Sequence, residues 1–376
     1  MHRAYRSACA SLLGTALLLA CSSSPAPAPA TPAAPSAPGP ATPQPAHPAS
    51  RWVPATYADL PGWAGDRTLE AWPALLRGCE RAPAAWAGVC ADARRTQPPD
   101  DAAARAWIEQ RLAPYRVESQ DGRAEGLITG YFEPLLEGRR QPQGPFRTPL
   151  HAVPADLNTR KPWYTRQQID TLPAAQAALR GRELAYVADP LDALLLQIQG
   201  SGRLRVTEPD GRERLVRLAY AGHNDHAYRS VGRWLVEQGE LKLEQASWPA
   251  IRAWAERNPA RRNDLLWANP RTVFFREEAL PDPTLGPRGA MGVALTARRS
   301  IAVDPLSLPY GTPVWIATTE PLSAQPLQRL TLAQDTGSAI TGAVRADYFW
   351  GDGPEAEAQA GRMKQPLRMW VLWPRQ

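Results

Sequence analysis

Three aspartates in the C-terminal part of the chain have the residue type and surroundings needed for acid–base chemistry. Asp304 precedes a proline, Asp335 begins the string Asp-Thr-Gly, and Asp347 follows a short run after Gly342. Each stands at the end of a strand-like run, where a small barrel would present carboxylates at its rim. The sequence offers neither a Gly-x-Ser-x-Gly nucleophile string nor a convincing metal cluster, so a carboxyl group is the expected reactive group.

Two local strings admit other readings. Asp335-Thr-Gly resembles the active-site loop of pepsin-like proteases, a chemistry that needs two carboxylates sharing one proton. Because the chain holds a single such string, an aspartic protease would require dimerisation across this loop. His223 and His226 could belong to a zinc site, but no third ligand follows at a recognisable spacing, and a loop with a helix cap is expected there.

The first 50 residues have the composition of an export signal and a tether. A basic start and a short apolar run predict a signal peptide over residues 1–20, since the run is too short to span a bilayer. Leu-Leu-Ala-Cys, ending at Cys21, resembles a bacterial lipobox whose Cys is acylated; the alternative is an ordinary signal peptide that contains a Cys. Residues 21–50 are predicted to be this lipidated Cys and a disordered linker, because residues 22–50 hold ten prolines and no Asp, Glu, Lys or Arg. Ser22 after the Cys favours the outer membrane.

Residues 51–376 are enough for two domains of ordinary globular composition. Hydrophobic residues make up 44% of the chain, and its net charge of +6 comes from scattered Lys and Arg rather than a basic stripe, which disfavours nucleic acid as a partner. In an exported protein a disulfide between Cys79 and Cys90 is expected, the alternative being two reduced buried thiols.

The elements that must position the aspartates are short. Helices are predicted over 100–111, over 225–237 and from Ser247 to before Pro259, within a chain that is helical and rich in Trp from 52 to about 114. Strands are predicted over 126–134, 194–199, 202–206 and 215–220, with turns at 200–202 and at Asp210-Gly211. From Thr272 onward, short strands with frequent Gly and Pro favour a barrel over a βαβ sheet.

Six ordered strings resemble the membrane-bound lytic murein transglycosylase A family, over about residue 125 to the end. They are Thr129-Gly-Tyr-Phe-Glu-Pro134; Gln199-Gly-Ser-Gly202; Tyr220-Ala-Gly-His-Asn224 with Tyr228-Arg-Ser-Val-Gly232; Asn269-Pro270 with Val273-Phe-Phe-Arg276; Gly289-Ala-Met-Gly-Val-Ala-Leu-Thr296; and the tail from Ala333 to Gly351. The tail looks like the 3D domain, named for three aspartates, here Asp304, Asp335 and Asp347. The resemblance implies a mainly β fold with some α: a double-psi β-barrel domain over 51–134 and 276–376, a smaller inserted β-rich domain over 135–275, and a groove between them.

The resemblance also implies the chemistry. The family cleaves the β-1,4 bond between N-acetylmuramic acid and N-acetylglucosamine and leaves a 1,6-anhydro product, with one Asp as acid and then base and with no metal or cofactor. That residue would be Asp335, and Ser338 replaces the Gly usual in its loop. Asp304 is expected to fix a turn. The substrate-binding residues would be Thr129, Gly130, Tyr131, Gln199, Ser201, Asn224 and Asp347.

The implied partners are peptidoglycan glycan strands and, through the lipid on Cys21, the periplasmic face of the outer membrane. A monomer is expected, and participation in a cell-wall synthesis complex is left open. The alternative function is a non-catalytic peptidoglycan-binding lipoprotein that kept the barrel and lost turnover.

Overall fold

The computed structural model describes residues 48–375. The predicted signal peptide, the lipidation of Cys21 and nearly all of the predicted linker lie outside the described residues. Ala49 and Ser50, at the end of that linker, already contact the body: the Ala49 N–H donates to Leu306 O, and the Ser50 hydroxyl donates to Ser307 O. Within residues 48–375, no helix combines the length and the apolarity that crossing a bilayer demands.

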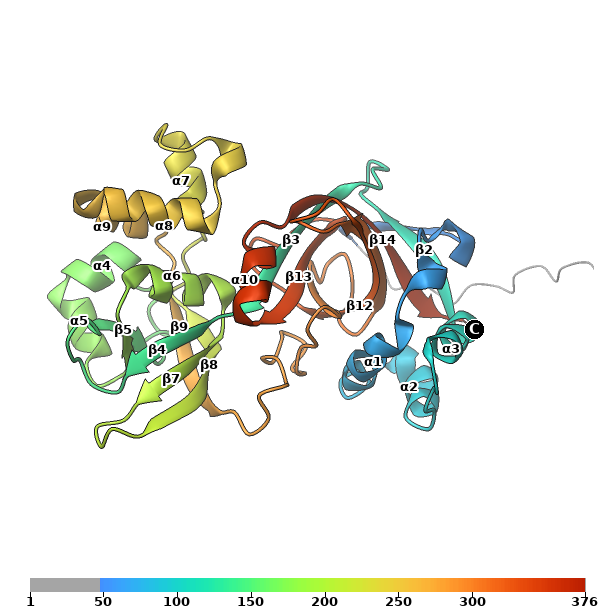
Figure 1. Ribbon diagram of the computed structural model, residues 1–376, viewed down its shortest axis with the longest axis horizontal. Helices are drawn as coiled ribbons and strands as arrows, with labels where there is room; N and C mark the ends of the chain where they lie inside the picture. The colour runs from blue at the N-terminus through green and yellow to red at the C-terminus, as the bar shows by residue number, and fades with distance from the viewer. Residues whose placement is uncertain (1–47, 376) are drawn as a thin grey trace, which may run out of the picture. The chain divides into compact units, whose positions relative to one another are not determined.

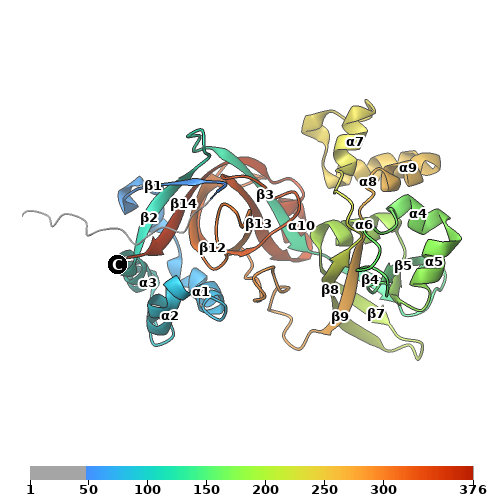
Figure 2. The same cartoon turned by 180° about the vertical axis from the view of Figure 1, so that it is seen from behind.

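Eight strands form the first sheet, and six of them close into a barrel. The sheet runs in the order β1 (Arg51–Pro54), β2 (Leu112–Glu118), β14 (Lys364–Pro374), β11 (Pro313–Thr319), β12 (Pro326–Asp335), β10 (Ser300–Val303), β13 (Arg345–Asp352) and β3 (Gly126–Glu133). A further pairing of β14 with β3 closes the ring. The pairs β10–β12 and β13–β3 are parallel, and the others are antiparallel. In Figures 1 and 2 the red strands β13 and β14 lie beside the teal β3, although more than 200 residues separate them in sequence.

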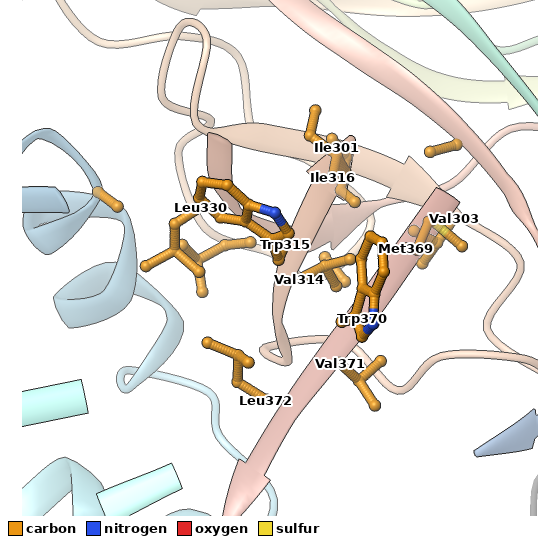
Figure 3. Packing of buried hydrophobic residues seen from close by; sticks show 14 of the residues in the cluster. Ile301, Val303, Val314, Trp315, Ile316, Leu330, Met369, Trp370, Val371 and Leu372 are labelled. Atoms are coloured by element: carbon orange, nitrogen blue, oxygen red, sulfur yellow. The ribbon is translucent and has the colours of Figure 1, made fainter. Parts of the chain in front are cut away.

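The barrel core consists of short apolar runs that would not be stable as isolated strands. Side chains from β10, β11, β12 and β14 pack together (Figure 3), among them Ile301, Val314, Ile316 and Leu330. Trp315 and Trp370 are paired in register across β11 and β14 and are both buried. The mainly β prediction from Thr272 onward is confirmed.

Short helices lie against this barrel at the N-terminal end of the described chain. They are the 3₁₀ helices η1 (Tyr57–Asp59), η2 (Trp63–Gly65), η3 (Thr68–Ala71) and η4 (Ala84–Trp86), and the α-helices α1 (Trp72–Gly78), α2 (Ala87–Ala93) and α3 (Asp101–Arg111). The predicted helix over 100–111 is confirmed: the Asp100 side chain caps α3 by accepting a hydrogen bond from the Ala103 N–H at 2.8 Å. Cys79 and Cys90, both buried, form a disulfide beside α1 and α2.

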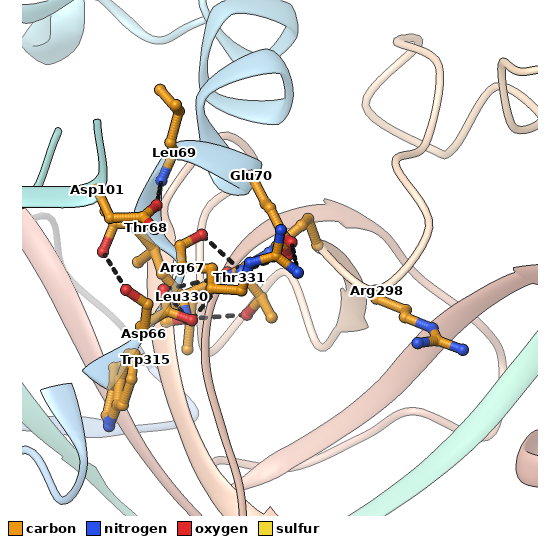
Figure 4. A network of polar contacts seen from close by, with 12 residues as sticks. Asp66, Arg67, Thr68, Leu69, Glu70, Asp101, Arg298, Trp315, Leu330 and Thr331 are labelled. Carbon is orange, nitrogen blue, oxygen red and sulfur yellow. Dashed lines mark hydrogen bonds and ion pairs between the residues drawn. The ribbon is translucent and has the colours of Figure 1, made fainter. Parts of the chain in front are cut away.

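A buried charge network joins this helical segment to the barrel (Figure 4). Arg299, directly before β10, is 2% exposed and donates from Nη1 to both carboxylate oxygens of Asp66 at 3.0 Å. Its Nη2 donates to Glu70 Oε2 at 2.9 Å and to a backbone carbonyl. The neighbouring Arg298 points away from the network and pairs with Glu355 instead. Because breaking a buried pair leaves a charge uncompensated, this network fixes the helical segment against β10.

The second sheet comes from the middle of the chain, in the order β5 (Thr148–His151), β6 (Glu183–Val187), β4 (Leu135–Arg139), β7 (Gly202–Thr207), β8 (Glu213–His223) and β9 (Val273–Ala279). Helices accompany it: α4 (Arg166–Thr171), α5 (Pro173–Leu179), α6 (Pro190–Gln199), α7 (Val231–Glu237), η5 (Leu243–Gln245), α8 (Trp248–Arg257), η6 (Pro259–Arg261) and α9 (Arg262–Trp267). Figure 1 shows α7, α8 and α9 grouped together, and their buried side chains form one cluster with Leu191 and Leu194 of α6. A last helix, α10 (Gly353–Ala360), follows β13.

Two predictions for this region are wrong in part. Residues 194–199 belong to helix α6, not to a strand: Asp189 caps its start, Pro190 occupies its first turn and Gly200, at φ 83°, ends it. A fully buried apolar run shows neither helical nor strand periodicity, so the residues at its two ends decide whether it forms a helix or a strand. The helix predicted from 225 begins only at Val231, where the Ser230 hydroxyl accepts from the Arg233 N–H. The hairpin at Asp210-Gly211 and the helix after Ser247 are confirmed.

Candidate active site

Strand register brings two of the three predicted aspartates to one place in the barrel. Ala302 of β10 pairs with Asp335 of β12 on one side and with Asp347 of β13 on the other. Asp347 in turn pairs with Thr129 of β3. Directly paired residues point to the same face of a sheet, so these side chains share a face with Tyr131, two residues beyond Thr129.

Each oxygen of the Asp335 carboxylate accepts a hydrogen bond from another part of the chain. The Tyr131 hydroxyl donates to Oδ2 at 2.9 Å, and the backbone N–H of Ala290 donates to Oδ1 at 2.8 Å. Ala290 belongs to the loop between β9 and β10, and this loop approaches closely because Gly289 has no side chain. A Cβ there would lie 2.4 Å from Gln334 O and 3.2 Å from Asp335 Cβ. Gly289 therefore allows the backbone donor to reach the carboxylate.

Burial raises the pKa of Asp335 above its ordinary value, and the donors from Ala290, Thr336 and Tyr131 offset part of that rise. The surroundings explain the effect: Tyr131, Leu295 and Phe349 form an apolar cluster around this part of the sheet. Burial, together with the charges of Asp335 and Asp347, also raises the pKa of the Tyr131 hydroxyl well above its ordinary value. Tyr131 therefore stays a proton donor over the whole range in which Asp335 titrates.

Asp347 has different partners. Its Oδ1 accepts from the Thr129 hydroxyl at 2.6 Å, and Arg345 donates to the same hydroxyl oxygen at 2.9 Å. Burial raises the pKa of Asp347 to about 6, against the opposing effects of Thr129 and Arg345, and the charge of Asp335 adds to the rise. Asp304, the third aspartate, accepts from the backbone N–H groups of Leu306 and Gly342 and so fixes two turns.

Asp335 opens into a pocket of about 700 Å³, which we call the active-site pocket. The barrel and its loops contribute Tyr131, Phe132, Pro287, Arg288, Gly289, Ala290, Gly292, Leu295, Asp335, Thr336, Gly337, Ser338 and Phe349. The middle region contributes Gln197, Ile198, Gln199, Gly200, Ser201, Ala219, Tyr220, His223, Arg271, Val273 and Arg276. Among the described residues of this lining, Asp335 is the one carboxylic acid.

Four of the predicted site residues, Asp335, Tyr131, Gln199 and Ser201, line this pocket. Gln199 also accepts from the Phe132 N–H through its side-chain oxygen at 3.1 Å, which ties the end of α6 to β3. Ser338 lines the pocket with an ordinary backbone conformation, since the non-glycine residues of 48–375 with positive φ are Asp225 and Arg298. The Ser at this position therefore introduces no backbone strain.

The other predicted site residues lie outside the lining. Thr129 and Asp347 bond to each other. Gly130 faces the opposite way, where a Cβ would lie 2.7 Å from Trp350 Nε1, so glycine allows β3 to pack closely. Asn224 is 0% exposed, and its side chain bonds to Tyr164 O, Pro270 O and the Thr272 N–H, which braces a loop.

Sequence reasoning missed the Ala290 donor and the basic side of the pocket. Ala290 lies inside the string Gly289-Ala-Met-Gly, but a backbone donor leaves no signature in residue type. Arg271, Arg276 and Arg288 line the pocket although they are far apart from Asp335 in sequence.

The described residues contain no group of three or more His, Cys, Asp and Glu side chains placed to hold a metal ion, and His226 bonds to Trp163 O.

An ion-pair cluster joins the two sheets beside the pocket. Glu133, at the end of β3, has a side chain with no exposed surface and accepts from Arg203 of β7 at 2.9 Å and from Arg217 of β8 at 2.5 Å. Arg203 also pairs with Asp352 at 2.8 Å. Two guanidinium groups on one buried carboxylate form a rigid connection, so β7 and β8 are held against the end of β3.

Family models match two parts of the chain: the MltA specific insert domain matches residues 127–276, and the 3D domain matches residues 299–373. Among curated proteins, the membrane-bound lytic murein transglycosylase A of Vibrio cholerae is 35% identical over 261 residues. The match covers 67% of this chain and 66% of that protein's length.

Solved structures are similar over nearly their full length. The lytic transglycosylase LtgG of Burkholderia pseudomallei is 45% identical with a TM-score of 0.60, covering 90% of this chain and 97% of that one. MltA from Neisseria gonorrhoeae is 32% identical with a TM-score of 0.73, covering 91% and 98%. E. coli MltA with bound chitohexaose is 28% identical with a TM-score of 0.65, covering 87% and 92%. The chain therefore belongs to the membrane-bound lytic murein transglycosylase A family.

Proposed function

We propose that this chain is a lytic transglycosylase of peptidoglycan that cleaves the β-1,4 bond between N-acetylmuramic acid and N-acetylglucosamine with Asp335 as acid and then base. The observation that carries the proposal is the solitary carboxyl of Asp335, which has a raised pKa and opens into a pocket with room for sugars. Family membership and the glycan chitohexaose bound to E. coli MltA support the same substrate class.

In the first step a protonated Asp335 acts as general acid. The Ala290 N–H can only donate to Oδ1, whereas the Tyr131 hydroxyl beside Oδ2 can rotate and accept a hydrogen bond, so we place the acidic proton on Oδ2. Oδ2 would donate this proton to the departing glycosidic O4 as positive charge develops on the sugar ring. The raised pKa keeps a proton on the carboxyl at a pH at which an ordinary aspartate is ionised.

In the second step the Asp335 carboxylate acts as base. It accepts the proton of the muramic acid C6 hydroxyl while that oxygen attacks C1 and closes the 1,6-anhydro ring, so no water enters the product. The Tyr131 hydroxyl and the Ala290 N–H stabilise the carboxylate between the two proton transfers. Donors fixed before the reaction are effective because they need no reorganisation.

The surroundings of Asp335 favour this one-carboxylate reaction over hydrolysis. Glycosidases that hydrolyse use two carboxyl groups that flank the scissile bond. The second aspartate here, Asp347, is bonded to Thr129 and lies outside the pocket lining. An intramolecular hydroxyl as nucleophile removes the need for a second carboxylate to activate water.

We further propose that the chain is attached to the outer membrane through a lipid on Cys21 and faces the periplasm. The names of the curated relatives describe them as membrane-bound. The lipobox-like string would provide an acylated Cys as the membrane anchor. The Pro-rich segment after it, residues 22–50, would be the tether that lets the body reach the cell wall.

The test is mass spectrometry of the muropeptides released from purified sacculi by the chain and by Asp335→Asn. Products one water lighter than hydrolysis products, present with the native chain and absent with the variant, are expected. Asp335→Asn should still sediment with sacculi and unfold at no lower temperature, because it removes a buried charge. Products that carry the added water would identify a hydrolase. Binding to sacculi without release would identify a glycan-binding protein instead.

A further inference from the structure

The middle region holds a second pocket, of about 370 Å³, that the proposed reaction does not use. We call it the insert pocket; it is lined by Thr148, Pro149, His151, Arg166, Ile169, Asp170, Gln176, Leu179, Glu183, Pro190, Ala193, Gln197, Leu266 and Thr272. The start of β9 separates it from the active-site pocket: Arg271 and Val273 line the active-site pocket, and Thr272 between them lines the insert pocket. The Gln197 side chain borders both.

Arg166 places a buried positive charge in the insert pocket, and no carboxylate of the described residues forms a direct ion pair with it. The residue is 8% exposed, and its three hydrogen bonds go to uncharged oxygens: Nε donates to Asn269 O, and Nη2 donates to Gln197 Oε1 and Arg271 O. The charge of Asp170, further along α4, offsets part of the cost of burying Arg166, but the Asp170 carboxylate accepts its hydrogen bond from Trp267 Nε1 at 2.7 Å. Desolvation lowers the pKa of Arg166 to about 10, which leaves it charged at neutral pH. A buried charge in a folded protein normally has a counterion, so an anion is the expected occupant.

A second polar group in the lining also lacks a partner. Thr272 is 6% exposed, and within residues 48–375 its hydroxyl oxygen makes no hydrogen bond, although its backbone N–H donates to Asn224 Oδ1. The Nη1 of Arg166 is likewise not used by any of that residue's bonds in this part of the chain. Buried polar atoms are nearly always bonded, so the buried Thr272 hydroxyl, in the same lining as a guanidinium with an unused Nη1, indicates a missing acceptor. A carboxylate has the two oxygens needed to accept from both.

The rest of the lining adds opposite charge. Asp170 and Glu183 line the pocket, and the charge of Glu183 acts on His151 in the same lining. Burial lowers the pKa of the His151 imidazole, which is neutral at pH 7. The pocket therefore combines a cationic donor for a carboxylate with carboxylates for an ammonium group. Its volume falls in the range of about 300–1,000 Å³ in which proteins hold small molecules.

We propose that the insert pocket binds the zwitterionic end of a short peptide, with the carboxylate on Arg166 and Thr272 and the ammonium on Glu183. The peptide stems of peptidoglycan carry free carboxylates and a free amine and are the source that we assign. That assignment of the source rests on the proposed function, whereas the chemistry of the pocket does not. The glycan would occupy one side of β9 and its peptide the other.

Binding is measured by isothermal titration with the full-length Asp335→Asn chain, so that no turnover occurs. The probes are the dipeptide γ-D-glutamyl-meso-diaminopimelate, which carries the free side-chain amine and the neighbouring carboxylate of a stem, its form N-acetylated on that amine and its form amidated on that carboxylate. Saturable binding of the dipeptide, weakened about tenfold by blocking either group, is expected. No saturable binding, or equal binding of the three probes, would overturn the proposal and leave a pocket filled by water.

The variant Thr272→Val tests the pocket without disturbing its frame, because the backbone bond to Asn224 remains. Loss of one hydrogen bond should weaken the dipeptide about fivefold. Thr312→Val is the matched control, because the buried Thr312 hydroxyl also lacks a partner among the described residues. Thr312 lies outside the insert pocket, so the loss of its hydroxyl should leave dipeptide binding unchanged. Glu183→Gln should abolish the preference for the free amine over the N-acetyl form. Equal affinities of the two Thr variants would contradict the assignment.

Two ligands test whether the peptide that binds is a peptidoglycan stem: disaccharide tetrapeptides released from sacculi, and the same disaccharide after an amidase has removed the peptide. Binding that requires the peptide and is weakened by Thr272→Val supports the stem. If the free dipeptide binds in a Thr272-dependent manner and the disaccharide tetrapeptide does not, the stem assignment is wrong. Because binding is read without turnover, a chain that binds the dipeptide but releases nothing from sacculi would uphold this site and overturn the proposed activity.

Discussion

Asp335 and Asp347 are separated by a single strand, because both pair in register with Ala302 of β10. With neighbouring strands about 4.8 Å apart, their backbones lie roughly 10 Å from each other. They receive different partners: the Tyr131 hydroxyl and the Ala290 N–H serve Asp335, and the Thr129 hydroxyl serves Asp347. The same barrel thus holds one aspartate in the lining of the active-site pocket and one outside it.

The pH dependence of activity should follow the protonation of Asp335. Its carboxyl must carry a proton to act as acid, and burial raises its pKa, so kcat/KM should fall as pH rises through a value above that of an ordinary aspartate. Release of anhydro-muropeptides measured from pH 4 to 9 checks this. A rate that is already falling at pH 4, or one that stays constant up to pH 9, would contradict the acid role.

Tyr131→Phe should move that pH profile. The Tyr131 hydroxyl stabilises the ionised Asp335, so its loss should raise the pKa of Asp335 and shift the falling limb to higher pH. The maximal rate should drop about 10- to 100-fold, because the carboxylate needed for the second step loses a donor. Tyr57→Phe is the control: its hydroxyl donates to Leu112 O and is absent from the lining of the active-site pocket. An unshifted profile would reduce Tyr131 to a packing role.

Asp347→Asn should change how stability depends on pH. The pKa of Asp347 is raised from 3.8 to about 6, so between these values the folded chain holds a proton that the unfolded chain has released. The free energy of unfolding therefore falls as pH rises from about 4 to 6. The variant lacks this loss and should gain up to about 3 kcal/mol relative to the native chain at pH 7.5, but not at pH 4. Urea unfolding at both pH values measures the difference; a difference independent of pH would exclude a raised pKa.

Asp66→Asn should destabilise the fold strongly. Arg299 is 2% exposed and would keep a buried charge with only Glu70 as counterion, so a loss of about 3–5 kcal/mol is expected. The control is Arg298→Gln, because its pair with the exposed Glu355 should contribute no more than about 1 kcal/mol. Thermal unfolding of both variants checks the contrast. Equal effects would mean that the network does not fix the helical segment to β10.

The sequence was sufficient to predict the family, the barrel and the carboxylate of the pocket, because each is marked by a short recognisable string of residues. Asp335 stands in a run whose type and spacing are recognisable, and Tyr131 and Gln199 lie in two others. The family membership and the mainly β fold are confirmed. The roles of Asp335, Tyr131, Gln199 and Ser201 stay predictions until the variants are measured.

The rest depends on register and close approach, which composition does not encode. Residues 194–199 read as a strand because a fully buried helix and a buried strand are both continuous apolar runs. Asn224 lies in one of the strings that resemble the family, yet its side chain is fully engaged by hydrogen bonds to three backbone groups. The partner of Asp335 on Oδ1 is a backbone N–H that only the loop after β9 could bring there.

The strand β14 pairs with β2, β3 and β11, and it is the last strand of the described chain. The strands of the second sheet, in contrast, all come from the continuous stretch between Leu135 and Ala279. Contacts between distant parts of a chain form slowly, because a long loop must first be closed. We therefore expect the middle region to fold early and the ring of strands late. The carboxyl of Asp335 would then become buried, and its pKa would rise, only when the final strand is in place.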